Sequence, residues 1–334
     1  MNKYSLHRYL QSKVEEQCGS LPLHFNGINE WLDYKIRLRE WLEENLPVIR
    51  NSHTGSGVST GIFAISDSVS LETADVQVDE NLAVPVSMYR PSAPAPSPAV
   101  MICPGFATPA NTGFYVSFAI SLAEAGITAV VMEYGGTGLC ADRPDCETDI
   151  NNIASAAHLL GMNEAGFRVS YNIAVFEFLR KNPAIIADRI GITGLCQGAI
   201  TAMYTTAAED GFASFAPLCG VSTYEAEVAD YAGRQGGWTG ISPFVFNVLN
   251  HGDFMHFLAA FAPKPILAQN NITDIHWPLQ GFEKTQKFVR NIYDLYGAGD
   301  NCIFLLSHSP HSYEGDNATG LVDFFIKTLG ENND

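Results

Sequence analysis

The chain has 334 residues, 46% of them hydrophobic and 16% charged, which is enough to bury the core of one large α/β domain with insertions or of two ordinary domains. Its formal net charge of -17 argues against nucleic acid and anionic membranes as partners, because their phosphate groups would repel it. Seven cysteines without a CxxC spacing predict neither a zinc site nor a disulfide framework. The first residues lack the apolar run of a signal peptide, and nowhere do about eighteen apolar residues follow one another, so we expect a cytoplasmic protein without a membrane span. The oligomeric state is left open.

An amphipathic helix is predicted over residues 28–46. Its apolar residues, among them Trp31 and Trp41, recur at three- and four-residue spacings with charged residues between them. Because this helix precedes every strand signal, we assign residues 1–59 to an N-terminal helical extension and residues 60–334 to the main domain.

Residues 60–90 alternate between apolar and polar side chains, most clearly over 74–79 and 83–89. This alternation predicts an antiparallel hairpin at the edge of a sheet. The proline-rich run 91–98 is stiff and extended, which predicts a loop.

From residue 99 onward, strand and helix signals alternate. This order is typical of a mostly parallel, twisted sheet with helices on both faces. Strands are predicted over residues 99–103, 128–132, 189–193, 214–218, 265–269 and 302–306. Helices are predicted over residues 114–125, 172–180, 199–208, 282–296 and 320–329.

The region from about 220 to 262 loses clean periodicity and is rich in aromatic residues and glycine. This composition fits a lid over an apolar pocket, with Trp238 and Phe254 as candidate substrate contacts. It fits an inert packing segment equally well.

Residues 194–198, Gly-Leu-Cys-Gln-Gly, lie between a predicted strand and a predicted helix. A sharp turn there needs small residues two positions before and after its apex, which explains Gly194 and Gly198. The turn would present the Cys196 thiol above the sheet edge, so Cys196 is the candidate nucleophile. The alternative is a structural cysteine buried after a strand.

A cysteine nucleophile needs a base, and the base needs an orienting acid. Asp274 follows the predicted strand 265–269, and His311 follows the predicted strand 302–306. The chain therefore offers nucleophile, acid and histidine in an order that suits a catalytic triad.

Other residues compete for these roles. His308 is nearer the strand than His311, which lies just before the last helix, where a loop histidine can reach over the sheet edge. Asp253 and Asp300 are rivals for the acid, although Asp300 has the position of a turn residue. His276 is either a candidate to line the cleft or an ordinary loop residue.

A tetrahedral intermediate needs N–H donors for its oxyanion. The residue after the nucleophile, Gln197, supplies one backbone N–H. The loop that leaves the strand 99–103 supplies the second from Phe106, because Gly105 lets the chain bend there. An ordinary Pro-Gly turn is the alternative.

These residues resemble the α/β-hydrolase superfamily, and within it the dienelactone hydrolase and acetyl xylan esterase-like group. The elbow around Cys196 resembles the cysteine-bearing version in dienelactone hydrolases, while residues 252–265 and 274–278 are similar to acetyl xylan esterase-like sequences. The resemblance implies the α/β-hydrolase fold with Cys196, Asp274 and His311 as nucleophile, acid and base, and without a cofactor or metal. Acetyl xylan esterases use serine, however, and dienelactone hydrolases lack the N-terminal helix and the aromatic insertion.

Three functions follow. The first is hydrolysis of an ester, lactone or thioester through a cysteine acyl-enzyme, with a small, apolar or aromatic acyl compound as substrate. The second is an acyltransferase or cyclase that uses the same thioester intermediate. The third is a non-catalytic binding protein that keeps the fold and has lost the chemistry.

Overall fold

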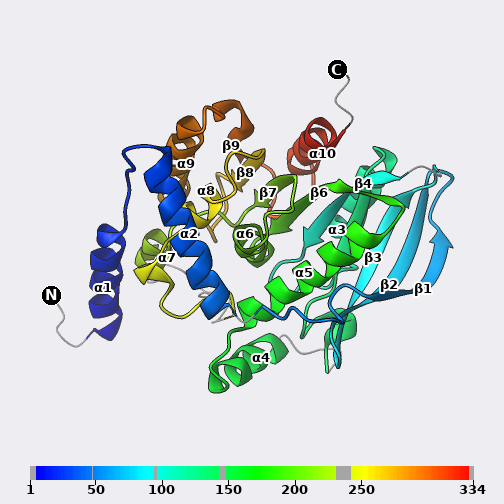
Figure 1. Cartoon of the computed structure of the whole chain (residues 1–334), viewed down its shortest axis with the longest axis horizontal. Helices are drawn as coiled ribbons and strands as arrows, with labels where there is room; N and C mark the ends of the chain where they lie inside the picture. Colours follow the sequence, from blue (N-terminus) through cyan, green and yellow to red (C-terminus); the bar gives the residue numbers. More distant parts are fainter. Residues whose placement is uncertain (1–4, 47, 94–95, 143–147, 231–241, 331–334) are drawn as a thin grey trace.

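The computed structural model of the chain describes residues 5–46, 48–93, 96–142, 148–230 and 242–330 (Figure 1). Its centre is a nine-stranded sheet in the order β1-β2-β3-β5-β4-β6-β7-β8-β9. The strands are β1 (Gly57–Ala64), β2 (Val69–Asp79), β3 (Leu82–Pro91), β4 (Ser97–Cys103), β5 (Thr128–Met132), β6 (Ile185–Leu195), β7 (Ser214–Leu218), β8 (Ile266–Asn271) and β9 (Cys302–Ser307).

The sheet is parallel from β5 to β9 and antiparallel from β1 to β3 and between β3 and β5. The expected mostly parallel sheet is therefore confirmed. The hairpin expected within residues 60–90 forms as β2 and β3, but β1 lies outside it as the edge strand.

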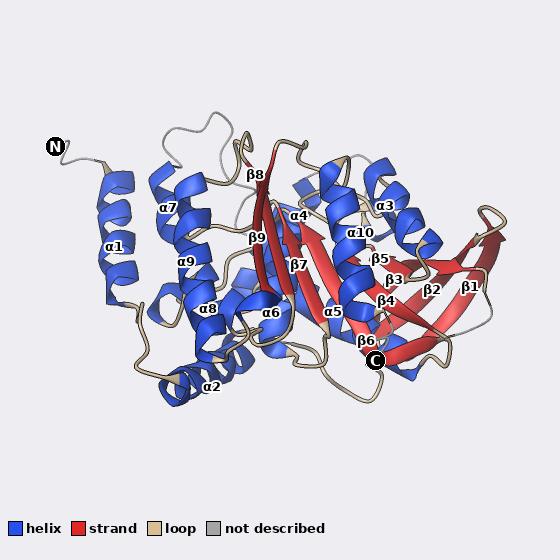
Figure 2. Cartoon of the chain, turned by 90° about the horizontal axis from the view of Figure 1, so that it is seen from above, coloured by secondary structure: helices blue, strands red, loops and turns tan. Residues whose placement is uncertain are grey.

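Helices cover the sheet on both faces. They are α3 (Gly113–Glu124), α4 (Thr148–Leu159), α5 (Glu164–Lys181), α6 (Gln197–Ala208), α9 (Leu279–Leu295) and α10 (Asp316–Leu329). Helices α3 and α10 pack together on one face, and α5 and α6 pack together on the other (Figures 1 and 2). This arrangement leaves the carboxyl ends of the parallel strands accessible to loops.

Helix α5 was only half predicted, because its burial hides the helical pattern. It is buried on nearly every side, and Glu164, Arg168 and Asn172 are among the buried residues. A helix with polar residues in the core shows no clear apolar stripe, so the periodicity of its first half was not visible in the sequence.

Two helices precede the sheet. Helix α2 (Ile28–Asn45) agrees with the predicted helix, and it buries Trp31 and Trp41 against neighbours that include α6 and α9. Helix α1 (Leu6–Ser20) was not predicted. It lies against α7 at one end of the molecule (Figure 1), and of its residues only Cys18 is buried, so it lacks a strong apolar face.

The region 220–262 contains short helices in its described part: α7 (Tyr224–Asp230), a 3-10 turn η3 (Val248–Asn250) and α8 (Phe254–Ala259). Each is too short to produce a recognisable period in the sequence. The prediction of a lid here stays a prediction.

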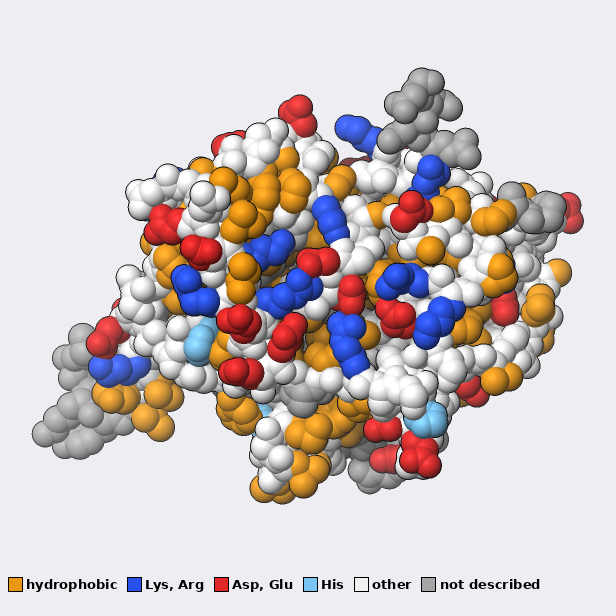
Figure 3. All heavy atoms as spheres, in the orientation of Figure 1, with side chains coloured by type: hydrophobic (Ala, Val, Ile, Leu, Met, Phe, Trp, Pro, Cys, Tyr) orange, Lys and Arg blue, Asp and Glu red, His pale blue; other side chains and the backbone are white. Residues whose placement is uncertain are grey.

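The outer surface mixes charges. On the face drawn in Figure 3, basic and acidic side chains are interspersed over the helices. No helix in the described ranges is both long and apolar enough to cross a bilayer.

Candidate active site

The predicted site residues lie on loops that leave one edge of the sheet. Strands β4, β6, β7, β8 and β9 run parallel, so their carboxyl ends meet at that edge. The loops that follow them carry Phe106, Cys196, Cys219, Asp274 and His311. Ligand sites of open α/β sheets form at this edge for the same topological reason.

Cys196 occupies the apex of the sharp turn between β6 and α6. Its backbone has φ 59° and ψ -121°, angles that a non-glycine residue adopts only where the surrounding structure enforces them. A Cβ atom at Gly194 would overlap the backbone of Gly198, and one at Gly198 would overlap the carbonyl of Cys103. The two glycines therefore let strand, turn and helix approach closely, as the sequence predicted. The Cys196 side chain is partly exposed.

His311 and Asp274 form a close pair. Nδ1 of His311 lies 2.6 Å from Oδ2 of Asp274, and the Asp274 side chain is 1% exposed against 30% for His311. Burial disfavours the imidazolium, but the bond to Asp274 and the interaction with the Cys196 sulfur outweigh it and raise the pKa of His311. Burial likewise opposes the Asp274 charge, and the bond to His311 outweighs it, so the pKa of Asp274 is lowered. The structure thus brings Asp274, His311 and Cys196 together.

The rival residues lie elsewhere. Asp253 is buried at the start of α8, where its carboxylate accepts hydrogen bonds from the N–H groups of Tyr224 and Phe254. Asp300 is exposed in the turn before β9, and His308 is exposed after it. Among the described contacts, none joins these three to the Asp274 pair.

Asn317, at the start of α10, fixes the loop that carries His311. The Asn317 amide donates to the carbonyl oxygens of Pro310 and Ser312, at 3.0 and 2.9 Å. Its oxygen accepts from Gln269 on β8 and Ser307 on β9, at 2.5 and 2.8 Å. One buried amide therefore ties the loop of His311 to strands β8 and β9. Its position in a helix gave no sequence signal for this role.

The expected oxyanion donors lie on adjacent loops. Cys103, at the end of β4, is the register partner of Gly194 on β6, so the loop with Phe106 leaves the sheet beside the elbow. In the described part of the chain, the N–H groups of Phe106 and Gln197 have no hydrogen-bond acceptor. Both are available to a ligand oxygen.

The donor loop is anchored by Tyr115 of α3. Its buried hydroxyl accepts a 2.7 Å hydrogen bond from the N–H of Gly105, the residue before Phe106. A Cβ atom at Gly105 would lie 3.5 Å from the Cβ of Cys196 and 3.6 Å from the Tyr115 hydroxyl. The anchor is therefore close to Cys196, and sequence reasoning missed it.

The side chain of Gln197 enters a buried polar network. It donates to Ser242, whose hydroxyl donates to Glu164 at 2.5 Å, and Glu164 pairs with Arg168 at 2.5 Å. The guanidinium of Arg168 lies 4.6 Å from the centre of the Tyr134 ring. This network holds the first turn of α6 and the chain at Ser242 together, although their residues are far apart in the sequence.

A second thiol belongs to the site. The donor atoms of Cys219, Asp274 and His311 all lie within 4.8 Å of one another. Because Nδ1 of His311 and Oδ2 of Asp274 already share a hydrogen bond, we interpret this group as the acid–base pair with a neighbouring thiol rather than as a metal centre. Burial is the main cause that raises the pKa of Cys219 to about 11. Its position directly after β7, as Cys196 follows β6, was the available sequence signal.

The structure places the three expected substrate contacts differently. Trp238 lies outside the described residues. Phe254 is fully buried, with its ring 4.6 Å from that of Tyr224, so it belongs to the core beneath the loops. His276 is exposed beside the base: its N–H donates to Asp274 at 2.9 Å, and its ring centre lies 5.4 Å from that of His311. Their role in binding substrate stays a prediction.

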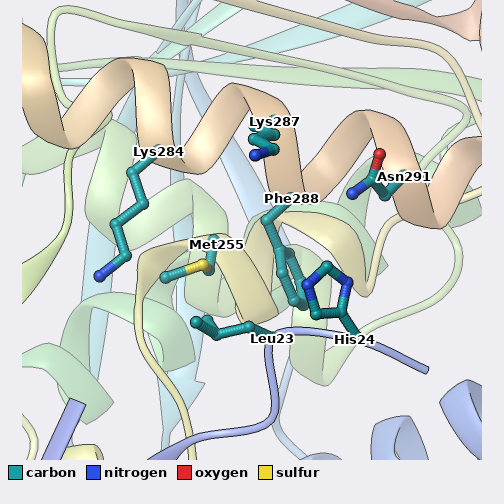
Figure 4. A pocket seen from close by; sticks show the side chains of 7 residues that line it. All are labelled: Leu23, His24, Met255, Lys284, Lys287, Phe288 and Asn291. Atoms are coloured by element: carbon teal, nitrogen blue, oxygen red, sulfur yellow. The ribbon is translucent and has the colours of Figure 1, made fainter. Parts of the chain in front are cut away.

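A small cavity of about 220 Å³ lies away from this edge, between the segment that joins α1 to α2 and helix α9 (Figure 4). Leu23, Met255 and Phe288 form its apolar wall, and Lys284 beside it pairs with Glu225. It has no described residue in common with the triad.

Known proteins resemble this chain in sequence and in fold. Residues 84–233, from β3 through the elbow, match the model of the dienelactone hydrolase family. The YtaP protein of Bacillus subtilis (strain 168), named as a proposed hydrolase, is 22% identical over 196 residues. That alignment covers 58% of this chain and 62% of YtaP, less than two thirds of its length.

Solved structures share the fold. A protein from Bacteroides fragilis NCTC 9343, named as a proposed acetyl xylan esterase, has a TM-score of 0.75 at 17% identity over 92% of this chain and 82% of its own. Methylesterase BT1017 has a TM-score of 0.69 at 18% identity over 95% of this chain and 68% of its own. A glucuronoyl esterase from Teredinibacter turnerae T7901 has a TM-score of 0.64 at 15% identity, with 94% and 90% covered. The chain therefore shares the α/β-hydrolase fold of these solved structures, and its residues 84–233 are similar to the dienelactone hydrolase family.

Proposed function

We propose that the chain hydrolyses carboxylic esters, lactones or thioesters through an acyl-thioester on Cys196. The observation that carries this proposal is the triad: a partly exposed thiol at a strained apex, beside a histidine that a buried aspartate holds at 2.6 Å. The proteins of similar fold that are named as esterases support an ester substrate. The raised pKa of His311 favours an imidazolium, which can give a proton to the leaving group.

In the first half-reaction, the Cys196 sulfur attacks the carbonyl carbon. The oxygen gains negative charge and accepts hydrogen bonds from the N–H groups of Gln197 and Phe106. His311 gives its proton to the leaving oxygen, so that the C–O bond breaks and a thioester remains. Asp274 keeps the imidazole in place and stabilises its charge.

In the second half-reaction, a water molecule replaces the leaving alcohol. His311 removes a proton from this water, which attacks the thioester carbonyl, and the thiolate of Cys196 leaves. The partial exposure of Cys196 and His311 supports this route, because water can reach both. Transfer of the acyl group to another nucleophile differs only in what replaces the water.

Trapping of the covalent intermediate tests the proposal. The protein is incubated with a panel of aryl esters, lactones and acyl thioesters, and its intact mass is followed with time. We expect an acyl adduct on Cys196 that Cys196→Ala lacks, together with a loss of at least about 10³ in kcat/KM in that variant. Cys302→Ala is the matched control, because this buried cysteine lies at the amino end of β9, whereas Cys196 follows the carboxyl end of β6.

Two results would contradict the proposal: full activity of Cys196→Ala, or an adduct on another residue. Product analysis with and without an added amine or alcohol separates hydrolysis from acyl transfer. An inert protein that binds the same compounds with unchanged mass would instead favour a binding function.

A further inference from the structure

Cys196 and Cys219 occupy equivalent positions on neighbouring strands. Leu195 of β6 and Leu218 of β7 are register partners in a parallel pair, and each cysteine is the next residue. The ladder continues past the last pair, because the N–H of Cys196 donates to the carbonyl of Leu218 at 3.0 Å. Neighbouring strands lie about 4.8 Å apart. Disulfides join residues whose Cα atoms are about 4.4–6.8 Å apart, so this placement suits a cross-link.

Both sulfur atoms are directed toward the same imidazole. Cys219 has its sulfur within 4.8 Å of a His311 nitrogen, and Cys196 also interacts with the His311 ring. Both sulfurs therefore lie near one imidazole at the carboxyl ends of the strands.

The backbone departs from strand geometry at both cysteines. Their φ angles are 59° and 48°, values that turn each side chain away from the pleated sheet. Gly220 follows Cys219, and a Cβ atom there would lie only 2.5 Å from the carbonyl oxygen of Cys196. A residue without a side chain thus lets the two loops lie in contact.

We propose that Cys219 is a resolving cysteine, which forms a reversible disulfide with Cys196 when a peroxide oxidises the nucleophile. Cys196 is the partly exposed thiol and Cys219 the buried one, so peroxide meets the nucleophile first. The inactivation that the disulfide would cause rests on the proposed function, whereas the cross-link itself does not.

The chemistry balances in two steps. The Cys196 thiol passes its proton to His311 and its sulfur attacks a peroxide oxygen: the S–O bond forms, the O–O bond breaks, and the released hydroxide takes that proton from His311 to become water. The Cys219 sulfur then attacks the sulfenic sulfur while its proton passes through His311 to the departing hydroxyl group. The S–S bond forms, the S–O bond breaks and a second water leaves. One peroxide is reduced and two thiols are oxidised to one disulfide.

The experiment treats the full chain with hydrogen peroxide and maps the product by mass spectrometry without reduction. No Lys or Arg lies between Arg189 and Arg234, so trypsin leaves both cysteines in one peptide, 190–234. Further cleavage after Glu209 separates them unless a disulfide joins them. We expect a mass loss of about 2 Da in the tryptic peptide and a linked pair of fragments after the second cleavage.

Activity provides the second readout. Wild-type protein is expected to lose at least about tenfold in activity with peroxide and to regain most of it with dithiothreitol. Cys219→Ser, compared with its own untreated activity, is expected to stay at least about tenfold lower after dithiothreitol, because its Cys196 proceeds to the sulfinic acid, about 32 Da heavier. Cys302→Ser is the control and is expected to recover as the wild type does.

A Cys196 sulfinic acid in the wild type without the linked fragments would overturn the proposal, as would recovery of Cys219→Ser equal to that of the wild type. If Cys219→Ser fails to fold, the fragment map of the wild type decides alone. A linked pair in a protein whose Cys196→Ala variant is fully active would leave the cross-link standing and refute the proposed function. An acyl adduct on Cys196 without any cross-link would support the proposed function and refute the resolving role of Cys219.

Discussion

Asp274 holds the ring of His311 in place: its Oδ2 lies 2.6 Å from Nδ1 of His311, on the loop that follows the neighbouring strand. The carboxylate is buried while the imidazole is partly exposed, so one end of the pair is fixed and the other can meet a substrate. The pKa of Asp274 is lowered and that of His311 is raised, which is the signature of a charged pair that the fold stabilises.

Replacement of the acid tests this pairing. Asp274→Asn is expected to lower kcat by about 10²–10⁴, because an amide holds the imidazole in the wrong tautomer and cannot stabilise its charge. Steady-state kinetics at a series of pH values measures the loss. Asp300→Asn, in an exposed turn, is the control and should leave kcat unchanged.

The effect of Asp274→Asn on the free energy of unfolding is expected to depend on pH. The ordinary pKa of an aspartate is 3.8, and that of Asp274 is lower in the folded protein, so its stabilisation is complete above 3.8 and disappears as the pH falls through the lowered value. The raised pKa of His311 gives the opposite sign: its contribution is complete below 6.5 and disappears as the pH rises through the raised value. Between these limits we expect Asp274→Asn to cost about 1–3 kcal/mol of unfolding free energy, and less below pH 4. Urea denaturation followed by circular dichroism measures it, and a constant difference down to pH 2 would contradict the assignment.

The tyrosine under the oxyanion loop is expected to affect turnover more than binding. Tyr115→Phe leaves the buried N–H of Gly105 without its acceptor, so the N–H of Phe106 is held less firmly. We expect kcat to fall about tenfold with little change in KM, and the unfolding free energy to fall by about 1 kcal/mol. Tyr293→Phe is the comparison, since it removes the 2.7 Å bond of a buried hydroxyl to the partly buried carbonyl of Lys264, away from the site. Equal kcat losses in both variants would refute the role of Tyr115.

Asn317 is expected to position the base. In Asn317→Ala the carbonyl oxygens of Pro310 and Ser312 each lose the hydrogen bond from Asn317, although Pro310 keeps the one from Asn271, and the His311 loop loses its tie to α10. We expect kcat to fall at least about tenfold, because the His311–Asp274 geometry changes. For the same reason, the acidic limb of the pH profile of kcat is expected to shift. Asn301→Ala, which removes a similar bond to the carbonyl of Pro263, should leave the profile unchanged.

Gly198 is expected to be irreplaceable on steric grounds. A Cβ atom there overlaps the carbonyl of Cys103, which belongs to the rigid end of β4, so Gly198→Ala should lower the unfolding free energy by more than about 2 kcal/mol. Gly320→Ala in α10 is the matched control: its Cβ meets nothing within 4 Å, and alanine should raise helix stability by up to about 1 kcal/mol. Thermal unfolding of the two variants provides the comparison.

The local pattern of the sequence determined much of this protein. Alternation of strand and helix signals predicted the parallel sheet, and the glycines around Cys196 predicted the sharp turn, because periodicity and turn chemistry act between residues close in the chain. The same reasoning placed Asp274 and His311 on loops after successive strands. The carboxyl ends of parallel strands must share an edge, so the order of these residues was enough to expect them together.

Only the tertiary structure decided which other side chains join them. The approach of Cys219 to His311, the Asn317 anchor and the Gln197–Ser242–Glu164 network depend on which strands and helices become neighbours, and contacts between residues far apart in sequence leave no local period. The surroundings of Phe254 also depend on residues far from it in the sequence. Its aromatic character suggested a substrate contact, and its full burial against Tyr224 at the start of α8 follows from packing that no single segment encodes.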